Sequence, residues 1–532
     1  MPWSEPRALE RIARHRASSP ETAVSVFDFS DYMRSRRVVA EQARALGATP
    51  QREWYVPPNR AVTTHGVHIY ANLLAYNERL VEQGRETEAS HARALQLLHF
   101  HYSACDLLTQ AFDIQRVDFH GGRLHAVVLT PEGEDREGER IAKALAFAAA
   151  FREMVDRAGR RYGADFQTDV RIGMDSGPAV AVNSGRASEP EPLFIGSPAN
   201  HAAKLADGDE PGIFLSPRLE QARTGLRPLS PVRFTEEAAT RILSETVDIR
   251  TLRKSARSPL DEAYATFVED QERLIEAHGG VRPAEFTFHY RQPPLRSVKF
   301  ADHPPSNSIR LPLASVFADI DGFTAYVDAA IANGRVAEAV SNLHVLRAEM
   351  AAVLQDDFGG RKIRFIGDCL HGVIAIGNAR DTDAMATIKE AVLTAAAIRS
   401  SFELCRARLP GIATLGIAIG IEYGPTPMCR LGLRGDASVR CSSSKATCVS
   451  EAAQAACGGV ETAIGEQAYS EGGATVKHLF GPARRVPNLT YPAAEAHLSG
   501  VNAPAVVGAG AAAGAPTASA ASAAPMRAHS AE

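Results

Sequence analysis

Two aspartates in the second half of the chain, Asp319 and Asp368, have the side chains and the local sequence to bind a divalent metal ion. Asp319 lies near the end of the apolar run LASVFADID, and Asp368 follows Gly367 between the β-rich runs KIRFIG and CLHGVIAIG. Glycine in a two-residue connection is typical of a β-hairpin, so we expect Asp368 at a hairpin tip beside the strand that contains Asp319. Mg²⁺ and Mn²⁺ favour carboxylate oxygens and complete their shells with water and phosphate oxygens.

The residues after Asp319 predict the start of a helix that could hold phosphate. Gly322, Phe323 and Thr324 open a helical pattern that continues toward Val345, and the free amides at a helix start attract phosphate. Two metal ions there could polarise the attacking and leaving oxygens of a phosphoryl transfer. Each aspartate alone has a structural alternative, as a helix cap or a turn residue. The two together favour function.

A second constellation lies in the first half of the chain, in PLFIGSPANHAAKLADG. Asn200 and Lys204 fall four residues apart on a helix that Gly196 and Pro198 introduce, so both should project from one face. An amide there suits orientation of a sugar, and a cation suits neutralisation of charge that develops on a phosphoryl group. The alternative is an exposed lysine with a capping asparagine.

The two halves are predicted to be complementary. The places of the two carboxylates are held in the first half by Asp28 and Gly122, so a two-carboxylate site cannot form there. In the second half, the nearest analogue of the Asn-Lys pair is Cys441 and Lys445. We therefore expect one half to supply carboxylates and the other to supply the amide and the cation.

The elements that must position these residues repeat along the chain. The second half reads as β-α-β-β-α-β, with a long helix over 383–409 and a last strand over 413–424. The first half repeats this order, with VSVFDFSDYM matching VFADIDGFT and VDFHGGRLHAVVL matching the hairpin, apart from an insertion at about 36–85. The predicted fold class is α+β, two ferredoxin-like (βαββαβ) domains in tandem.

Composition shifts set the expected domain boundaries. Pro, Gly and Ser concentrate at 279–310, and the end of the chain is almost entirely Ala, Gly, Pro and Ser. We predict a first domain at 1–225, a helical and Pro-rich connector at 226–310, a second domain at 311–500 and a disordered tail at 501–532, because such a tail cannot bury enough apolar surface to fold.

The bulk composition argues against several classes of protein. The 532 residues are 45% apolar and 23% charged, with a net charge of −4, so no nucleic-acid footprint is expected. Without a signal peptide or an apolar run of membrane length, the expected location is the cytoplasm, away from the membrane. The seven cysteines contain no CxxC pair, which favours reduced or buried thiols over disulfides or a zinc site.

Four motifs in order resemble those of class III adenylyl and guanylyl cyclases: FADIDGFT, FIGDCLHGVIA, RIGMDSGPAVA and FIGSPANHAAKLA. The resemblance implies that the tandem cyclase homology domains form an intramolecular pseudo-heterodimer with one live site. Asp319 and Asp368 would bind two Mg²⁺ or Mn²⁺ ions with help from the Ile320 carbonyl. Asn200 would hold the ribose, and Lys204, in place of the usual Arg, would meet the α-phosphate while the 3′-hydroxyl attacks it and expels pyrophosphate.

The base-reading positions depart from those of purine cyclases. Leu193 stands where an acidic residue is common, and the counterpart of the base-reading Lys falls near Asp118, with Arg116 close by. The segments 430–465 and 288–324 resemble the pyrimidine cyclases of bacterial Pycsar anti-phage systems. That resemblance implies cyclic UMP or cyclic CMP made on phage infection, acting on a downstream effector, with UTP favoured as substrate.

Several alternatives remain at this stage. A cytidylate cyclase, an adenylyl or guanylyl cyclase, and a non-catalytic nucleotide sensor all fit the same domains. A polymerase-palm or diguanylate-type enzyme fits the duplication and the Asn-Lys helix poorly. The tandem arrangement permits either a monomer or a higher oligomer.

Overall fold

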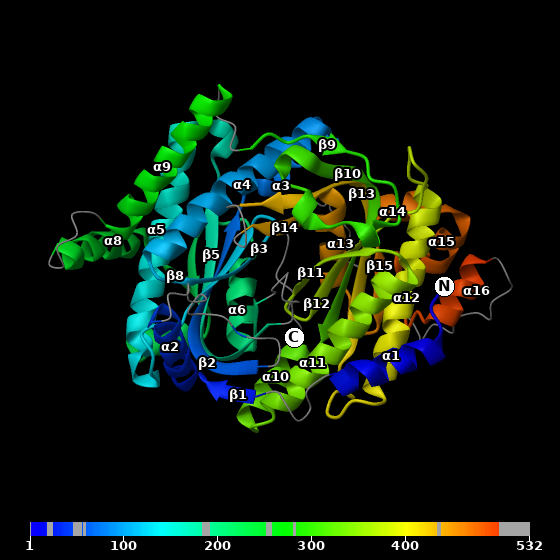
Figure 1. The fold of residues 1–532 in the computed structure, drawn as a ribbon, viewed down its shortest axis with the longest axis horizontal. Helices are drawn as coiled ribbons and strands as arrows, with labels where there is room; N and C mark the ends of the chain where they lie inside the picture. Colours follow the sequence, from blue (N-terminus) through cyan, green and yellow to red (C-terminus); the bar gives the residue numbers. More distant parts are fainter. Residues whose placement is uncertain are drawn as a thin grey trace.

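The chain folds into two sheets that face each other across a central interface (Figure 1). The structure is a computed structural model that describes residues 2–18, 25–45, 56, 60–183, 192–251, 258–279, 284–432 and 438–499. The tail predicted at 501–532 lies outside these ranges. Among the helices within them, none is long and apolar enough to cross a membrane.

Each sheet has eight strands in the same order. The first runs β3-β4-β2-β5-β7-β8, with β1 on β2 and β6 on β5, and the second runs β11-β12-β10-β13-β15-β16, with β9 on β10 and β14 on β13. The first four strands of each path, β3-β4-β2-β5 and β11-β12-β10-β13, have the order of a ferredoxin-like sheet, which confirms the predicted fold class. The strands are β1 Ser25–Asp28, β2 Arg60–Leu73, β3 Gln115–His120, β4 Arg123–Val128, β5 Val170–Asn183, β6 Pro192–Ile195, β7 Gly212–Leu215, β8 Val232–Phe234, β9 Phe288–His289, β10 Ser308–Asp321, β11 Arg361–Ile366, β12 Cys369–Ile374, β13 Gly416–Leu431, β14 Val439–Ser442, β15 Glu461–Ile464 and β16 Arg485–Pro487.

The register shows which residues of the two copies correspond. Both hairpins have a register irregularity at the same place, between Arg116 and Asp118 in one and between Lys362 and Arg364 in the other. Beyond it, two residues separate the hairpin strands in each copy. Asp118 therefore corresponds to Arg364.

The central strand of the first domain is β2, which corrects the predicted repeat. The segment VSVFDFSDYM forms only the short strand β1, which pairs parallel to β2 as β9 pairs parallel to β10. The presumed insertion at 36–85 contains β2, whose Ala71 lies opposite Leu124 as Ala318 lies opposite Leu370. The place of Asp319 is consequently held by Asn72 and not by Asp28. Alternation of apolar and polar residues in VTTHGVHIYANL was the overlooked strand signal.

Helix α5 packs on the first sheet and α12 on the second, whereas α6 and α10 contact each other across the interface (Figure 1). The predicted helix after Gly322 is divided into α10 and α11, and the long helix at 383–409 is α12. The helices are α1 Glu5–Ser18, α2 Phe29–Ala45, α3 Tyr76–Arg79, α4 Glu88–Ala111, α5 Glu137–Tyr162, α6 Ser197–Ala206, α7 Pro217–Thr224, α8 Glu236–Thr251, α9 Pro259–His278, α10 Phe323–Ala332, α11 Val336–Ala352, α12 Ala384–Arg406, α13 Lys445–Ala455, α14 Glu466–Glu471, α15 Gly473–Phe480 and α16 Tyr491–Leu498.

The helices α6 and α13 cross the sheets at matching glycines. A Cβ on Gly173 would stand 2.1 Å from the Ala202 carbonyl oxygen, and one on Gly420 would stand 2.1 Å from the Ser450 carbonyl oxygen. These glycines occupy equivalent places on β5 and β13. Only glycine permits so close a crossing, so the same device fixes the position of both helices.

The predicted connector at 226–310 is divided between the domains. Strand β8 belongs to the first sheet, and α8 and α9 pack on α5 and α4. Strand β9 and the start of β10 belong to the second sheet. The true break therefore falls between α9 and β9.

The first helix of the chain packs on the second domain. Arg11 of α1 donates to Glu349 on α11 at 2.6 Å and to Asp357 at 2.8 Å, with all three side chains buried. Trp3 donates to Ser401 on α12 at 2.9 Å. Helix α1, which the sequence assigns to the domain at 1–225, therefore packs on elements of the second domain.

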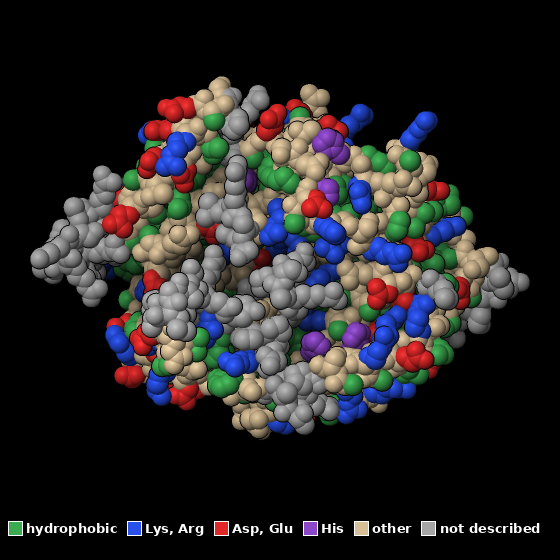
Figure 2. All heavy atoms as spheres, viewed as in Figure 1, with side chains coloured by type: hydrophobic (Ala, Val, Ile, Leu, Met, Phe, Trp, Pro, Cys, Tyr) green, Lys and Arg blue, Asp and Glu red, His purple; other side chains and the backbone are tan. Residues whose placement is uncertain are grey.

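Figure 2 shows acidic and basic side chains intermixed over the visible face, in keeping with the small net charge. All seven cysteines are described, and each is a free thiol. Six are buried and Cys457 is half-buried.

Candidate functional site

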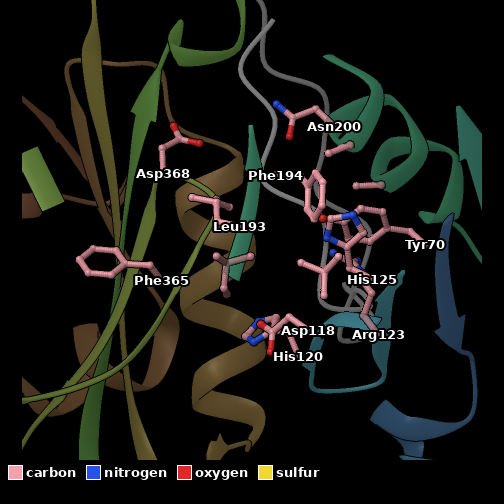
Figure 3. Close-up of a pocket in the computed structure, with 15 residues that line it drawn as sticks. Tyr70, Asp118, His120, Arg123, His125, Leu193, Phe194, Asn200, Phe365 and Asp368 are labelled. Carbon is pink, nitrogen blue, oxygen red and sulfur yellow. The ribbon is translucent and has the colours of Figure 1, made fainter. Parts of the chain in front are cut away.

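A cavity lies between the two domains, and both contribute to its wall. Figure 3 shows Asp368 on one side and Asn200 on the other, with Tyr70, His125 and Arg123 gathered on the side of the first domain. The lining residues are Tyr70, Val117, Asp118, His120, Arg123, His125, Leu193, Phe194, Ala199, Asn200, Ala203, Phe365, Ile366, Gly367 and Asp368. Asp118, Leu193, Asn200 and Asp368, all singled out by the sequence, therefore meet in one place.

The two aspartates lie where the sequence predicts them. Gly367 and Asp368 form the two-residue turn between β11 and β12, with Gly367 at a φ of 60°. Asp319 is buried near the end of β10, followed by the buried Ile320. Gly322, at a φ of 80°, ends the strand, and α10 begins at Phe323 as expected.

Electrostatics at the pair fit a cation site. Burial and the nearby negative charge of Asp319 raise the pKa of Asp368 well above its usual range. Two carboxylates that oppose each other's ionisation are stabilised by a positive ion between them. Within the described ranges no cluster of three or more His, Cys, Asp or Glu side chains converges to hold a metal. The pair would therefore hold a cation together with backbone, water and phosphate oxygens, which suits Mg²⁺ or Mn²⁺.

Asn200 reaches the second domain directly. Its side-chain amide donates to the hydroxyl of Thr324, in the first turn of α10. Lys204 follows one helical turn later, and its side chain is exposed rather than part of the cavity wall. Helix α6 thus presents an amide to the interface with an exposed cation beyond it.

Behind α6, a buried carboxylate fixes the helix to its own domain. Asp175 on β5 is fully buried and accepts hydrogen bonds from His201 at 3.0 Å, from Ser216 and from Arg218. Burial opposes its ionisation, but these hydrogen bonds outweigh that effect and lower the pKa of the carboxyl below its usual range. His201 is the neighbour of Asn200, so this contact restrains α6 beyond its first turn.

Asp118 and Arg116 differ in their relation to the cavity. Asp118 lines it, and Arg364 of the second domain donates to both of its carboxylate oxygens at 2.8 Å. Arg116 instead pairs with Asp106 at 2.9 Å and lies over the ring of Phe119. It is not among the residues that line the cavity, so its predicted contact with substrate lacks support in the geometry.

The cavity also contains side chains that sequence reasoning missed. Arg123 is buried and pairs with Asp207 at 2.8 Å, and the rings of Tyr70 and His125 stack at 4.3 Å. Burial lowers the pKa of His125 well below its usual range, so this ring stays neutral. Tyr70 lies on β2, and Arg123 and His125 lie on the neighbouring β4, so placing the central strand at β1 concealed this group.

The opposite face of the interface is closed. Gly122 takes the place of Asp368, as predicted, and an added Cβ there would lie 3.1 Å from that of Tyr76. Because Gly173 lies against Ala202 and the equivalent Gly420 lies against Ser450, Ala202 and Ser450 are equivalent residues of α6 and α13. Counting from them, Cys448 holds the position of Asn200 and Ala452 that of Lys204, which corrects the predicted pair of Cys441 and Lys445. At these equivalent positions, all of them described, there is neither a carboxylate pair nor an amide with a cation.

Comparisons with known proteins give close relatives over nearly the whole chain, although no protein-family model matches it. A uridylate cyclase from a Rhizobium species is 46% identical over 489 residues, which cover 90% of this chain and 92% of that protein. A uridylate cyclase from Pseudomonas aeruginosa is 35% identical over 498 residues, covering 92% and 90% respectively. The crystal structure of a class III adenylyl cyclase-like ATP-binding protein from Pseudomonas aeruginosa superposes with a TM-score of 0.79 at 33% identity, covering 94% of this chain and 100% of that one.

Proposed function

We propose that this chain, which belongs to the uridylate cyclase family of class III nucleotide cyclases, converts UTP to 3′,5′-cyclic UMP and pyrophosphate in the cavity between its domains. The observation that carries the proposal is the division of the cavity wall between Asp368 of one domain and Asn200 of the other. A reaction that needs both groups then depends on the docked pair of domains.

The proposed roles follow from the positions of the side chains. Asn200 binds and orients the ribose so that its 3′-oxygen lies in line with the α-phosphorus. A bond forms between these two atoms as the bond to the pyrophosphate oxygen breaks, and the hydroxyl proton passes to solvent. The exposed Lys204 contacts the α-phosphate and offsets the negative charge that develops there. The amides at the start of α10, at Gly322, Phe323 and Thr324, face the triphosphate.

Asp319 and Asp368, with the Ile320 carbonyl, would hold two Mg²⁺ or Mn²⁺ ions. When bound, these ions neutralise the triphosphate and lower the cost of the developing negative charge. The mutual repulsion of the two carboxylates supports this assignment.

The cavity supports a pyrimidine base. Uracil has one N–H donor flanked by two carbonyl acceptors, and the wall offers the Arg123 guanidinium as a donor and the Asp118 carboxylate as an acceptor. Leu193 presents an apolar side chain and cannot accept a hydrogen bond from an exocyclic amine. The wall therefore favours a base whose edge needs both a donor and an acceptor.

Product analysis tests the proposal. Purified full-length protein is incubated separately with UTP, CTP, ATP and GTP in the presence of Mn²⁺, and the products are identified by chromatography and mass spectrometry. Cyclic UMP should dominate, and Asp368→Ala should lower its rate by about 10³-fold while the circular dichroism spectrum stays unchanged. Cyclic AMP as the main product would contradict the assignment to UTP, and full activity of the variant would contradict the metal site.

The Pycsar resemblance supports a role for the product. Cyclic UMP made in the cytoplasm during phage infection would act as a second messenger for a partner effector. Cells that carry the cyclase with such an effector should accumulate cyclic UMP after infection and resist the phage. Resistance that persists in the Asp368→Ala strain would contradict this role.

A further inference from the structure

The helix that presents Asn200 begins without a capping side chain of its own. Its N-cap is Gly196, at a φ of 128°, and no side chain of that residue can accept the first amides. The matching helix α13 has Ser444 as its N-cap, whose hydroxyl accepts from the Thr447 amide at 3.2 Å. Since the first amides of a helix need acceptors, α6 depends on other parts of the chain.

An acceptor comes from the other domain. Asp328 lies on α10, and its carboxylate accepts from the backbone amide of Ser197, the first residue of α6, at 2.9 Å. A negative charge at this end also interacts favourably with the helix dipole. Asp328 follows Thr324 by one helical turn, so the same face of α10 holds both the start of α6 and the Asn200 side chain.

The Asn200–Thr324 contact must change during the proposed reaction, whereas the Asp328–Ser197 contact need not. Asn200 must leave the Thr324 hydroxyl when its amide takes the ribose, whereas the bond between Asp328 and Ser197 involves no group that the substrate needs. The Asp328 contact can therefore persist through the reaction and hold α6 in place while Asn200 changes partner.

We propose that Asp328 is a positioning residue, which caps α6 from the second domain and so holds the first turn of this helix in the place that presents Asn200 to the ribose when the two domains are docked. The proposal rests on the cyclase function proposed above. Under this proposal, the first turn of α6 is aligned when the interface forms, because separation of the domains removes the cap.

The opposite face supplies a matched control. Glu86 of the first domain accepts from the Lys445 amide, the first residue of α13, at 2.7 Å. That contact copies the one between Asp328 and Ser197, but α13 also has its own Ser444 cap and has neither an amide nor a cation at the places that α6 uses. Loss of the Glu86 contact should leave cyclisation intact.

The test compares Asp328→Ala, Asp328→Asn and Glu86→Ala in the full-length enzyme. Asp328→Ala should lower kcat for cyclic UMP by about 10-fold with little change in KM or in thermal midpoint, because Asn200 is misplaced in the transition state. Asp328→Asn keeps an acceptor oxygen and should retain kcat to within about threefold. Glu86→Ala should keep kcat unchanged.

Hydrogen exchange on the substrate-free proteins gives a second readout. Exchange at the first turn of α6 should speed up in Asp328→Ala, while exchange elsewhere in the first domain stays unchanged. Unchanged exchange at α6, or an equal loss of kcat in Glu86→Ala, would overturn the proposal. If the unmodified enzyme makes no cyclic UMP, the proposed function fails, and the exchange comparison still decides whether Asp328 holds α6.

Discussion

The two faces of the domain interface have the same backbone arrangement but different side chains. On the open face, Asp368 lines a cavity with Asn200 of α6, and Asp319 is buried on β10. On the closed face, Asn72 and Gly122 take the places of the two aspartates, and Cys448 of α13 takes that of Asn200. Strand register and the helix crossings are the same on both. The difference teaches that the fold supplies two potential sites and that the residues at a few equivalent positions leave one of them able to react.

The closed face is also filled. Tyr76 takes the place of Phe323 and hydrogen-bonds to Ser443, and the thiol of Cys448 lies 3.6 Å from the Asn77 side-chain oxygen, where Asn200 contacts Thr324 on the other face. On this face, side chains of the two domains therefore contact each other at the positions where a nucleotide would bind on the open face.

Exchanging residues between the faces should have the largest effect. Asp319→Asn installs the residue of the closed face and should lower cyclic UMP formation by about 10³-fold, because one carboxylate of the proposed metal site is lost. The converse change, Asn72→Asp, should add no activity, since Gly122 still has no side chain. Turnover assays with Mn²⁺ measure both, and substantial activity in Asp319→Asn would show that the faces do not differ in the way described.

Truncating the equivalent helix residues sharpens the comparison further. Asn200→Ala should lower kcat by about 10²-fold, through loss of the proposed hydrogen bond to the ribose. Cys448→Ala, at the equivalent place on α13, should leave kcat unchanged. Steady-state kinetics on the two variants decide this, and equal losses would mean that both helices act.

The ion pair that joins the domains beside the cavity should affect stability. Asp118→Ala leaves the buried Arg364 guanidinium without its carboxylate and should lower the free energy of unfolding by about 2 to 3 kcal/mol, reduced from the fully buried case because Asp118 is partly exposed. The double variant Asp118→Ala, Arg364→Met should recover part of this loss. Urea unfolding measures both, and an unchanged midpoint in the single variant would show that the pair contributes little.

The smallest expected effect depends on pH and concerns the buried carboxylates behind α6 and α13. Asp175 and Glu422 occupy equivalent places, but burial raises the pKa of Glu422 despite backbone amides that donate to it, whereas the pKa of Asp175 is lowered. Ionised Asp175 therefore stabilises the fold above pH 3.8, and this contribution is lost as the pH falls through its folded pKa. Asp175→Asn weakens the charge-assisted hydrogen bonds from Arg218 and His201 and should lower the free energy of unfolding by about 2 kcal/mol at pH 7.

Urea unfolding between about pH 7 and pH 3 tests this contrast. The difference between Asp175→Asn and the unmodified protein should shrink below pH 3.8. For Glu422→Gln, the free energy of unfolding of the unmodified protein should rise relative to that of the variant as the pH falls toward 4.5. Protonation then removes the cost of a buried charge, and only the unmodified protein has that charge. Identical trends in the two variants would contradict the assignment.

The sequence predicted most of the second domain and the positions of Asp319 and Asp368 in it, for a physical reason. Asp319 and Asp368 lie beside glycines whose positive φ marks a strand end and a hairpin turn, so local patterns placed them correctly. The first domain was harder. Strand β1 contains a short apolar run, whereas β2 mixes threonines and histidines with its apolar residues. Local patterns therefore favoured β1 as the central strand, and only the pairing of the strands identifies β2.

Residues that act through distant partners were not predictable in this way. Nothing in the local sequence of Asp328 indicates the amide of Ser197, which lies 131 residues away along the chain. The same holds for Arg123 and Asp207, which the fold joins across 84 residues. Such contacts depend on how whole sheets and helices pack, which the spacing of residues does not encode.

The docking of α1 on the second domain also governs the order in which a working enzyme can be completed during synthesis. Trp3 and Arg11 leave the ribosome before their partners Ser401, Glu349 and Asp357, which follow 398, 338 and 346 residues later. A nascent chain interrupted after the first domain holds Asn200 without either aspartate. Such a chain lacks half of the proposed site, and α1 can reach its partners only after much of the second domain has been made.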